Sequence, residues 1–232
     1  MPSAEQIIAT IQAHADPVQA QNLQRFFKTG AGQYGEGDVF WGVKVPVVRR
    51  IAKAFTTATL PIVNVLLDHA VHEVRLCALL LLVEQFSKAS EIQRKNIIDF
   101  YLYHAERVNN WDLVDLSVRL LGTWLIDKDR ALLDELAASP ILWKQRMAVV
   151  ATHTFIRLGD FEDILRLSQK LMHHPHDLIH KALGWMLREV GKQDRAVLSA
   201  FLHQHRPHMP RTMLRYAIEH YPEPERKAWL QA

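Results

Sequence analysis

A drifting repeat of paired helices constrains the fold of this chain more than any other feature of its sequence. From Pro61 onward, apolar residues recur at three- and four-residue spacing, and residues that break helices interrupt the pattern. The interruptions are Ala70-Val71, Val108-Asn109, Ser139-Pro140, Gly159-Asp160, His174-Pro175 and Pro207. No convincing alternating strand pattern appears, so we expect helix after helix.

The repeat becomes visible when the second helix of each pair is aligned with the next. The aligned positions are Arg75, Asp115, Arg146, Lys181 and Thr212, which are 40, 31, 35 and 31 residues apart. Drifting periods of this size with paired helices are typical of α-solenoids of HEAT-like or armadillo type. We therefore predict an all-α fold of antiparallel helix pairs whose inner helices line one concave, basic surface.

We expect the whole chain of 232 residues to form one repeat domain. Residues 1–58 should hold N-terminal helices and a glycine-rich loop, and residues 59–232 the helix pairs. Ser3 and Asp16 are good caps for the first two helices. The segment Gly30 to Gly42 has five glycines but also four large or anchoring side chains, which favours an ordered loop over a flexible linker.

The net charge of +3 is too small to identify a nucleic-acid binder, but its distribution is informative. Residues 1–139 carry 14 basic against 16 acidic side chains, whereas residues 140–220 carry 12 against 7. The excess positive charge therefore gathers in the later half, as an anionic partner lying across that surface would require.

The N-terminus lacks the order of a signal peptide, and the longest apolar run, Leu76 to Val83, is too short to cross a bilayer. We therefore expect a cytoplasmic protein with no membrane partner. The single cysteine, Cys77, lies inside that run, so we expect a buried thiol.

The segment from Asn109 to Asp115 sets an aromatic residue and a carboxylate one helical turn apart. Asn109 or Asn110 can cap a helix, which places Trp111 and Asp115 on one face of it. The aligned position holds a cation in three of the other four repeats, so Asp115 is the acid in a basic row. Either the site needs a negative charge there, or the acid only answers the helix dipole.

A second group of candidates follows in the later repeats. Lys181, Trp185 and Arg188 share one helix face, and Lys144 with Arg146 begins another inner helix. Tryptophans beside polar residues often stack on nucleic acid, and basic residues bind phosphates. Core packing for the tryptophan and simple solvation for the cations remain the alternative interpretations.

The sequence gives little support for a metal site or for a catalytic serine or cysteine. The 13 histidines include two clusters, but neither has the spacing of a zinc site, and we read both as loop histidines. No serine or cysteine lies in a recognisable nucleophile motif. If the protein is an enzyme, the chemical group is the carboxylate, and we expect no cofactor.

Three motifs in order resemble the DNA alkylation repair glycosylases built from HEAT-like repeats, the AlkD family. They are Asn110-Trp111-Asp112-Leu113-Val114-Asp115, the helix start Trp143-Lys144-Gln145-Arg146-Met147-Ala148, and Lys181-Ala182-Leu183-Gly184-Trp185-Met186-Leu187-Arg188-Glu189. With the segment from Phe26 to Gly30 and the loop through Pro46, the resemblance spans most of the chain.

The resemblance implies a monofunctional glycosylase that removes positively charged N3- or N7-alkylated purines from duplex DNA in base excision repair. It implies that Asp115 is the catalytic aspartate and that Trp111 and Trp185 contact the sugar and backbone. Arg146 and Arg188 would contact DNA. An aromatic residue of the family, often tyrosine, corresponds to Phe26, so any role of its hydroxyl is absent or moved.

The rival hypothesis is a non-catalytic HEAT-type scaffold that binds a protein or holds DNA, since a fold does not imply activity. The discriminating feature is the acid with its tryptophans, which a generic scaffold does not need. A solenoid that reads DNA alone should be a monomer.

Overall fold

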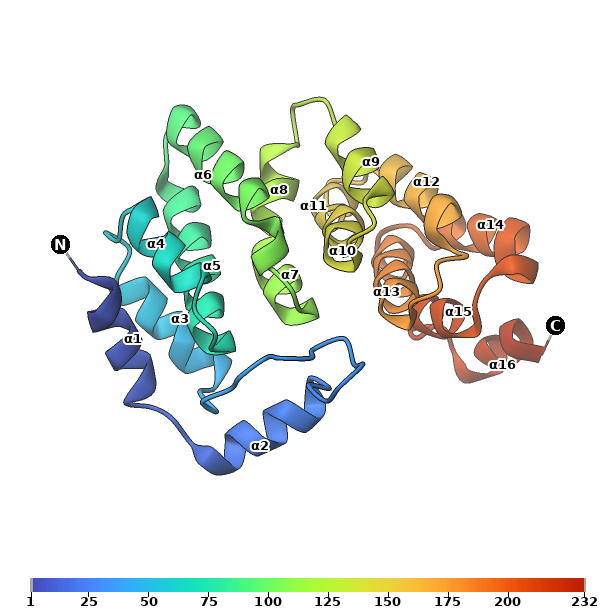
Figure 1. Cartoon of the computed structure of the whole chain (residues 1–232). Helices are drawn as coiled ribbons and strands as arrows, with labels where there is room; N and C mark the ends of the chain where they lie inside the picture. Colours follow the sequence, from blue (N-terminus) through green and yellow to red (C-terminus); the bar gives the residue numbers. More distant parts are fainter. Residues whose placement is uncertain (1, 232) are drawn as a thin grey trace. The chain divides into compact units, whose positions relative to one another are not determined.

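The structure is a computed structural model that describes residues 2–231, and it is helical along most of that length (Figure 1). Within this range no strand forms, and Val39 and Val71 make an isolated β-bridge. The predicted all-α class is confirmed. The chain divides into two compact units, Met1–Leu120 and Leu121–Ala232. No helix between residues 2 and 231 is long and apolar enough to span a bilayer.

The helices of the first unit follow the expected order. They are α1 (Ala4–Gln12), α2 (Pro17–Phe26), α3 (Val45–Ala54), α4 (Leu60–Leu67), α5 (His72–Lys88), α6 (Glu91–Tyr103), the 3-10 helix η1 (Ala105–Arg107) and α7 (Trp111–Ser117). Ser3 caps α1 by accepting the Gln6 N–H, and Asp16 caps α2 by accepting two backbone N–H groups, as predicted.

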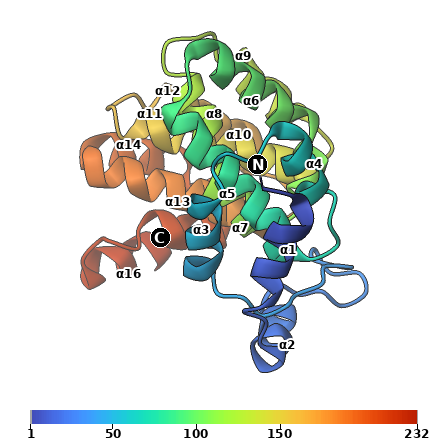
Figure 2. The same cartoon turned by 90° about the vertical axis from the view of Figure 1, so that its left-hand side faces the viewer.

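Helix α5 is the centre of the first unit. Its residues from His72 to Val83 are all buried, including Cys77, because α1, α3, α4, α6 and α7 all pack against it. Figure 2 shows α1, α3 and α5 beside one another. A helix that is apolar all round belongs inside a packed domain. The buried thiol predicted for Cys77 is confirmed.

The loop between α2 and α3 packs closely against the start of α2. Its backbone lies against the start of α2, where Gly42 adopts a φ of 85°. A Cβ on Gly42 would come within 2.1 Å of the Asp16 carbonyl oxygen, so no larger residue fits. The Asp16 N–H also donates to the Trp41 carbonyl at 2.8 Å, which fixes the end of the loop.

In the second unit the helices pack around α13. The elements are α8 (Arg119–Trp124), whose first two residues belong to the first unit, α9 (Ala131–Ala138), α10 (Leu142–Ala151), α11 (His153–Ile156), α12 (Glu162–Leu171), α13 (Asp177–Gln193), α14 (Arg195–His205), η2 (Arg206–His208), α15 (Arg211–Ala217) and α16 (Glu223–Gln231). Helices α10, α11, α12, α14 and α15 contact α13. Gly184 permits a close approach of α15 to α13, because a Cβ there would lie 2.5 Å from the Met213 carbonyl oxygen.

The five aligned positions each fall on a helix, namely α5, α7, α10, α13 and α15. Two cations of the predicted basic row are nevertheless buried. Arg75 and Arg146 are each 5% exposed. Arg75 binds Asp38, and Arg146 donates to the Leu178 carbonyl at 2.7 Å. Both guanidinium groups therefore join neighbouring segments inside the protein.

Candidate functional site

Helix α7 begins where the sequence placed it. Asn110 is the N-cap, since its side-chain oxygen accepts the Trp111 N–H at 2.8 Å. One turn later Asp115 lies on the same helix, and both Trp111 and Asp115 are half-buried. Burial raises the pKa of Tyr101 on α6, and the negative charge of Asp115 raises it further.

A pocket of about 530 Å³ opens beside Asp115 and Trp111 in the first unit. Most of its wall is aromatic or aliphatic, with a few polar groups. The lining residues are Gln19, Leu23, Phe26, Phe27, Phe40, Val43, Lys44, Val45, Pro46, His72, Glu73, Leu76, Trp111, Asp112, Asp115 and Leu116. A largely apolar pocket with a few polar groups is the usual form of a ligand site.

The aromatic wall is one continuous series of ring contacts. The imidazole of His72 stacks on Phe40 at 4.5 Å between centroids, and Phe40 stacks on Phe27 at 5.0 Å. Phe27 then stacks on Trp111 at 5.1 Å. Phe26 meets the edge of Trp111 at 5.8 Å and is itself 62% exposed. The series thus ends in an aromatic surface open to a ligand.

Behind this wall lies a buried network of charged side chains. His72 makes contacts of 3.0 Å with Asp38 and 2.9 Å with Asp112 through its two ring nitrogens. Asp38 also binds the Arg75 guanidinium and accepts from the Asn110 amide at 3.0 Å. All five residues are at most 8% exposed. Two carboxylates thus face two cationic groups away from water, as buried charges require.

The network explains the charge state of His72. Burial alone would lower the pKa of His72, but Asp112 and Asp38 outweigh it and raise the pKa to about 9. Burial would raise the pKa of Asp38, yet His72, Arg75 and Asn110 hold it below its usual value. At neutral pH the imidazolium therefore donates to both carboxylates.

Glu73 holds the other end of the glycine-rich loop. Its carboxylate accepts the backbone N–H groups of Gly42 at 2.7 Å, Val43 at 3.0 Å and Trp41 at 3.1 Å. Glu73 is 2% exposed. The first turn of α5 thus fixes the loop that forms one side of the pocket.

Basic residues lie next to this pocket on α3. Arg49, Arg50 and Lys53 line a shallow hollow that shares Val45 and Pro46 with the pocket wall. Their place beside an aromatic pocket suits contacts with an anionic backbone.

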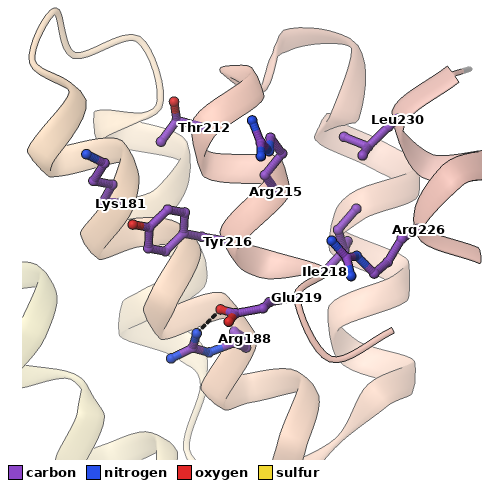
Figure 3. A pocket seen from close by; sticks show the side chains of 9 residues that line it. All are labelled: Lys181, Arg188, Thr212, Arg215, Tyr216, Ile218, Glu219, Arg226 and Leu230. Atoms are coloured by element: carbon purple, nitrogen blue, oxygen red, sulfur yellow. Dashed lines mark hydrogen bonds and ion pairs between the residues drawn. The ribbon is translucent and has the colours of Figure 1, made fainter. Parts of the chain in front are cut away.

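The second unit has a basic groove of its own, of about 570 Å³ (Figure 3). Helices α13, α15 and α16 contribute most of its side chains, of which four are basic and one is acidic. The lining residues are Lys181, Arg188, Thr212, Arg215, Tyr216, Ile218, Glu219, Arg226 and Leu230. Arg188 forms an ion pair with Glu219, drawn as a dashed line in Figure 3. Lys181 pairs with Asp177 at 2.9 Å.

The other predicted residues of the second unit have different surroundings. Trp185 is half-buried, 6.2 Å from the ring of His153. Lys144 is half-buried near the start of α10. Arg146 is buried, and its guanidinium supports the first turn of α13 through the Leu178 carbonyl. The surface position that DNA contact would require is therefore not found for Arg146.

Several residues of the pocket were not among the sequence candidates. Phe27, Phe40 and His72 are more than 30 residues from Trp111 in sequence, and their types gave no local signal. The Asp38-His72-Asp112 series also lacked a recognisable spacing. Within residues 2–231 no group of histidine, cysteine or acidic side chains could hold a metal ion.

Comparison with known proteins identifies the family. Residues 7–221 match the model of the family described as DNA alkylation repair enzyme. A solved structure described as a predicted DNA alkylation repair enzyme from Enterococcus faecalis is 16% identical, with a TM-score of 0.71. The alignment covers 90% of this chain and 98% of that one, which supports the fold. Comparison with curated protein sequences finds no match. With a family model that matches nearly its whole length, the chain belongs to the DNA alkylation repair enzymes.

Proposed function

We propose that the protein is a DNA glycosylase that hydrolyses the N-glycosidic bond of N3- or N7-alkylated purines in duplex DNA. The observation that carries this proposal is Asp115, which lines an aromatic pocket together with Trp111 and Phe26. Membership of a DNA alkylation repair family supports a DNA substrate.

The chemistry of such substrates fits this set of groups. An N3- or N7-alkylated purine carries a positive charge and leaves as a neutral base with the bonding electron pair, so no general acid is required. The sugar then carries the charge as an oxocarbenium ion. The Asp115 carboxylate and the π-face of Trp111 can stabilise that cation. Asp115 can also orient the water that adds at C1′ and loses its proton to solvent.

DNA contacts are proposed for the basic residues around the pocket and in the groove of the second unit. Arg49, Arg50 and Lys53 would bind phosphates beside the aromatic pocket. Lys181 and Arg188 would bind phosphates in the groove of the second unit. Phe26 is exposed enough to stack on a sugar or base. We propose that Lys144 and Trp185 contact the DNA backbone, and we leave Arg146 out because it is buried.

The second candidate function is DNA binding without catalysis. The groove of the second unit favours it, since four basic side chains and Tyr216 suit any nucleic-acid strand. Incubation of the purified protein with methylated duplex DNA separates the two. Release of free 7-methylguanine or 3-methyladenine supports the glycosylase. Binding of the duplex with no released base, at protein in excess over DNA, would reject it.

A further inference from the structure

The buried network around His72 joins three segments that are far apart in the sequence. Asp38 belongs to the glycine-rich loop, His72 begins α5, and Asp112 lies in the first turn of α7. Asn110, the N-cap of α7, donates to the same Asp38 oxygen that His72 contacts. The loop and α5 therefore hold the start of α7 at two positions, Asn110 and Asp112.

The consequence for the pocket is geometric. Trp111 lies between Asn110 and Asp112, which are both held by the network, and Asp115 follows one turn later. The Asp112 carboxylate has a second bond, from the Leu113 N–H at 2.8 Å, so its position also fixes the helix backbone. A short helix of seven residues has little stability of its own, and its orientation depends on such contacts.

The imidazole acts on Trp111 by a second route. His72 stacks on Phe40, and Phe40 connects through Phe27 to the indole of Trp111. The same ring thus binds Asp112, the residue directly after Trp111, and supports the rings against which the Trp111 side chain packs. A buried hydrogen-bonded charge with aromatic neighbours on one side is a rigid support.

We propose that His72 is a positioning residue, whose imidazolium, held between Asp38 and Asp112, orients Trp111 and Asp115 for base excision. The effect on base excision rests on the proposed function, whereas the orientation of Trp111 and Asp115 by His72 does not. It also gives the glycine-rich loop a role, namely to supply Asp38.

The charge of His72 gives the proposal a pH dependence. The charged groups around it are Asp38 from the loop, Arg75 and Glu73 from α5, and Asp112 from α7; Lys44 and Asp115 line the same pocket. The pKa of His72 is raised from 6.5 to about 9 in the folded protein. The stabilisation is therefore fully present below pH 6.5 and is lost as the pH rises through about 9.

The test uses the full chain labelled with 5-fluorotryptophan, in which the Trp111→Phe variant assigns the fluorine resonance of Trp111. We expect this resonance to be constant near neutral pH and to shift with a midpoint near pH 9. In Asp38→Asn, which removes one of the two carboxylates, the midpoint should move to lower pH. In His72→Gln the transition should vanish, and the resonance should be displaced already at pH 7.

Activity provides the second measurement. Under single-turnover conditions, His72→Gln should release 7-methylguanine at least tenfold more slowly, while its affinity for DNA stays within about twofold. Asp163→Asn is the matched control, because Asp163 is also buried and binds two arginines, but in the second unit. It should lower stability without moving the Trp111 resonance. Circular dichroism at each pH verifies that each variant is folded.

The two measurements fail in different ways. A Trp111 resonance that does not change up to pH 10 in the folded wild type would overturn the proposal. The proposal would also be overturned if the resonance of Asp38→Asn shifted with the same midpoint pH as that of the wild type. A wild type that shows the predicted shift but releases no base would instead reject the glycosylase function. If His72→Gln does not fold, the displaced midpoint in Asp38→Asn remains the deciding result.

Discussion

Replacement of Glu73 by alanine should destabilise the first unit strongly. The carboxylate accepts three backbone N–H groups at 2.7, 3.0 and 3.1 Å, and the residue is 2% exposed. An unsatisfied buried donor costs about 1–3 kcal/mol. Since Trp41 is half-buried and water can reach part of that site, we expect a loss of about 3–5 kcal/mol in the free energy of unfolding.

Urea unfolding followed by circular dichroism measures this loss, and amide hydrogen exchange at Trp41 to Val43 localises it. Glu73→Gln should cost about half as much, because one oxygen can still accept from Gly42 and Val43. Glu36→Ala is the matched control. Glu36 also accepts a loop N–H, from Gly32 at 2.8 Å, but it is exposed. A cost for Glu73→Ala no larger than that for Glu36→Ala would refute the reasoning.

Three further predictions concern the loop, the aromatic wall and the buried arginine. Gly37 and Gly42 have similar φ values of 83° and 85°, but only at Gly42 would an added Cβ collide with neighbouring backbone atoms. We expect Gly37→Ala to lower the free energy of unfolding in urea by about 1 kcal/mol and Gly42→Ala by about 3 kcal/mol. Equal losses would contradict the close approach at Gly42. Phe26→Ala should cost under about 1 kcal/mol of stability, because Phe26 is 62% exposed, yet it should weaken duplex binding in a fluorescence anisotropy titration. Arg146→Ala should lower the stability of the second unit by about 2 kcal/mol and leave the salt dependence of DNA binding unchanged. Arg188→Ala should reduce the slope of log affinity against log salt concentration by about one. The reverse pattern would indicate that Arg146, and not Arg188, contacts DNA.

The fold could be predicted from sequence because the signals are local. Apolar spacing gave the helices, and Ser3, Asp16 and Asn110 cap them through groups at most three residues away. The five aligned positions also each lie in a helix, because the apolar spacing around them is a local signal. Such signals do not need knowledge of how distant segments meet.

The site could be predicted only in part, because its remaining contacts are long-range. Asp112 binds His72, which lies 40 residues earlier in the sequence. Asn110 binds Asp38, 72 residues earlier. Arg146 and Lys181 occupied equivalent places in the alignment, yet only Arg146 is buried. Burial depends on how the next repeat packs, which the local pattern does not contain.

The most direct test of the proposed chemistry is the rate of 7-methylguanine release by Asp115→Asn, measured in a single turnover on methylated duplex DNA. Asn keeps the shape of the side chain but removes its charge, so we predict that release is abolished while duplex affinity stays within about twofold. Asp99→Asn, an exposed carboxylate paired with Lys95 in the same unit, should release base as the wild type does. Undiminished release by Asp115→Asn would contradict the assignment of Asp115 as the catalytic carboxylate.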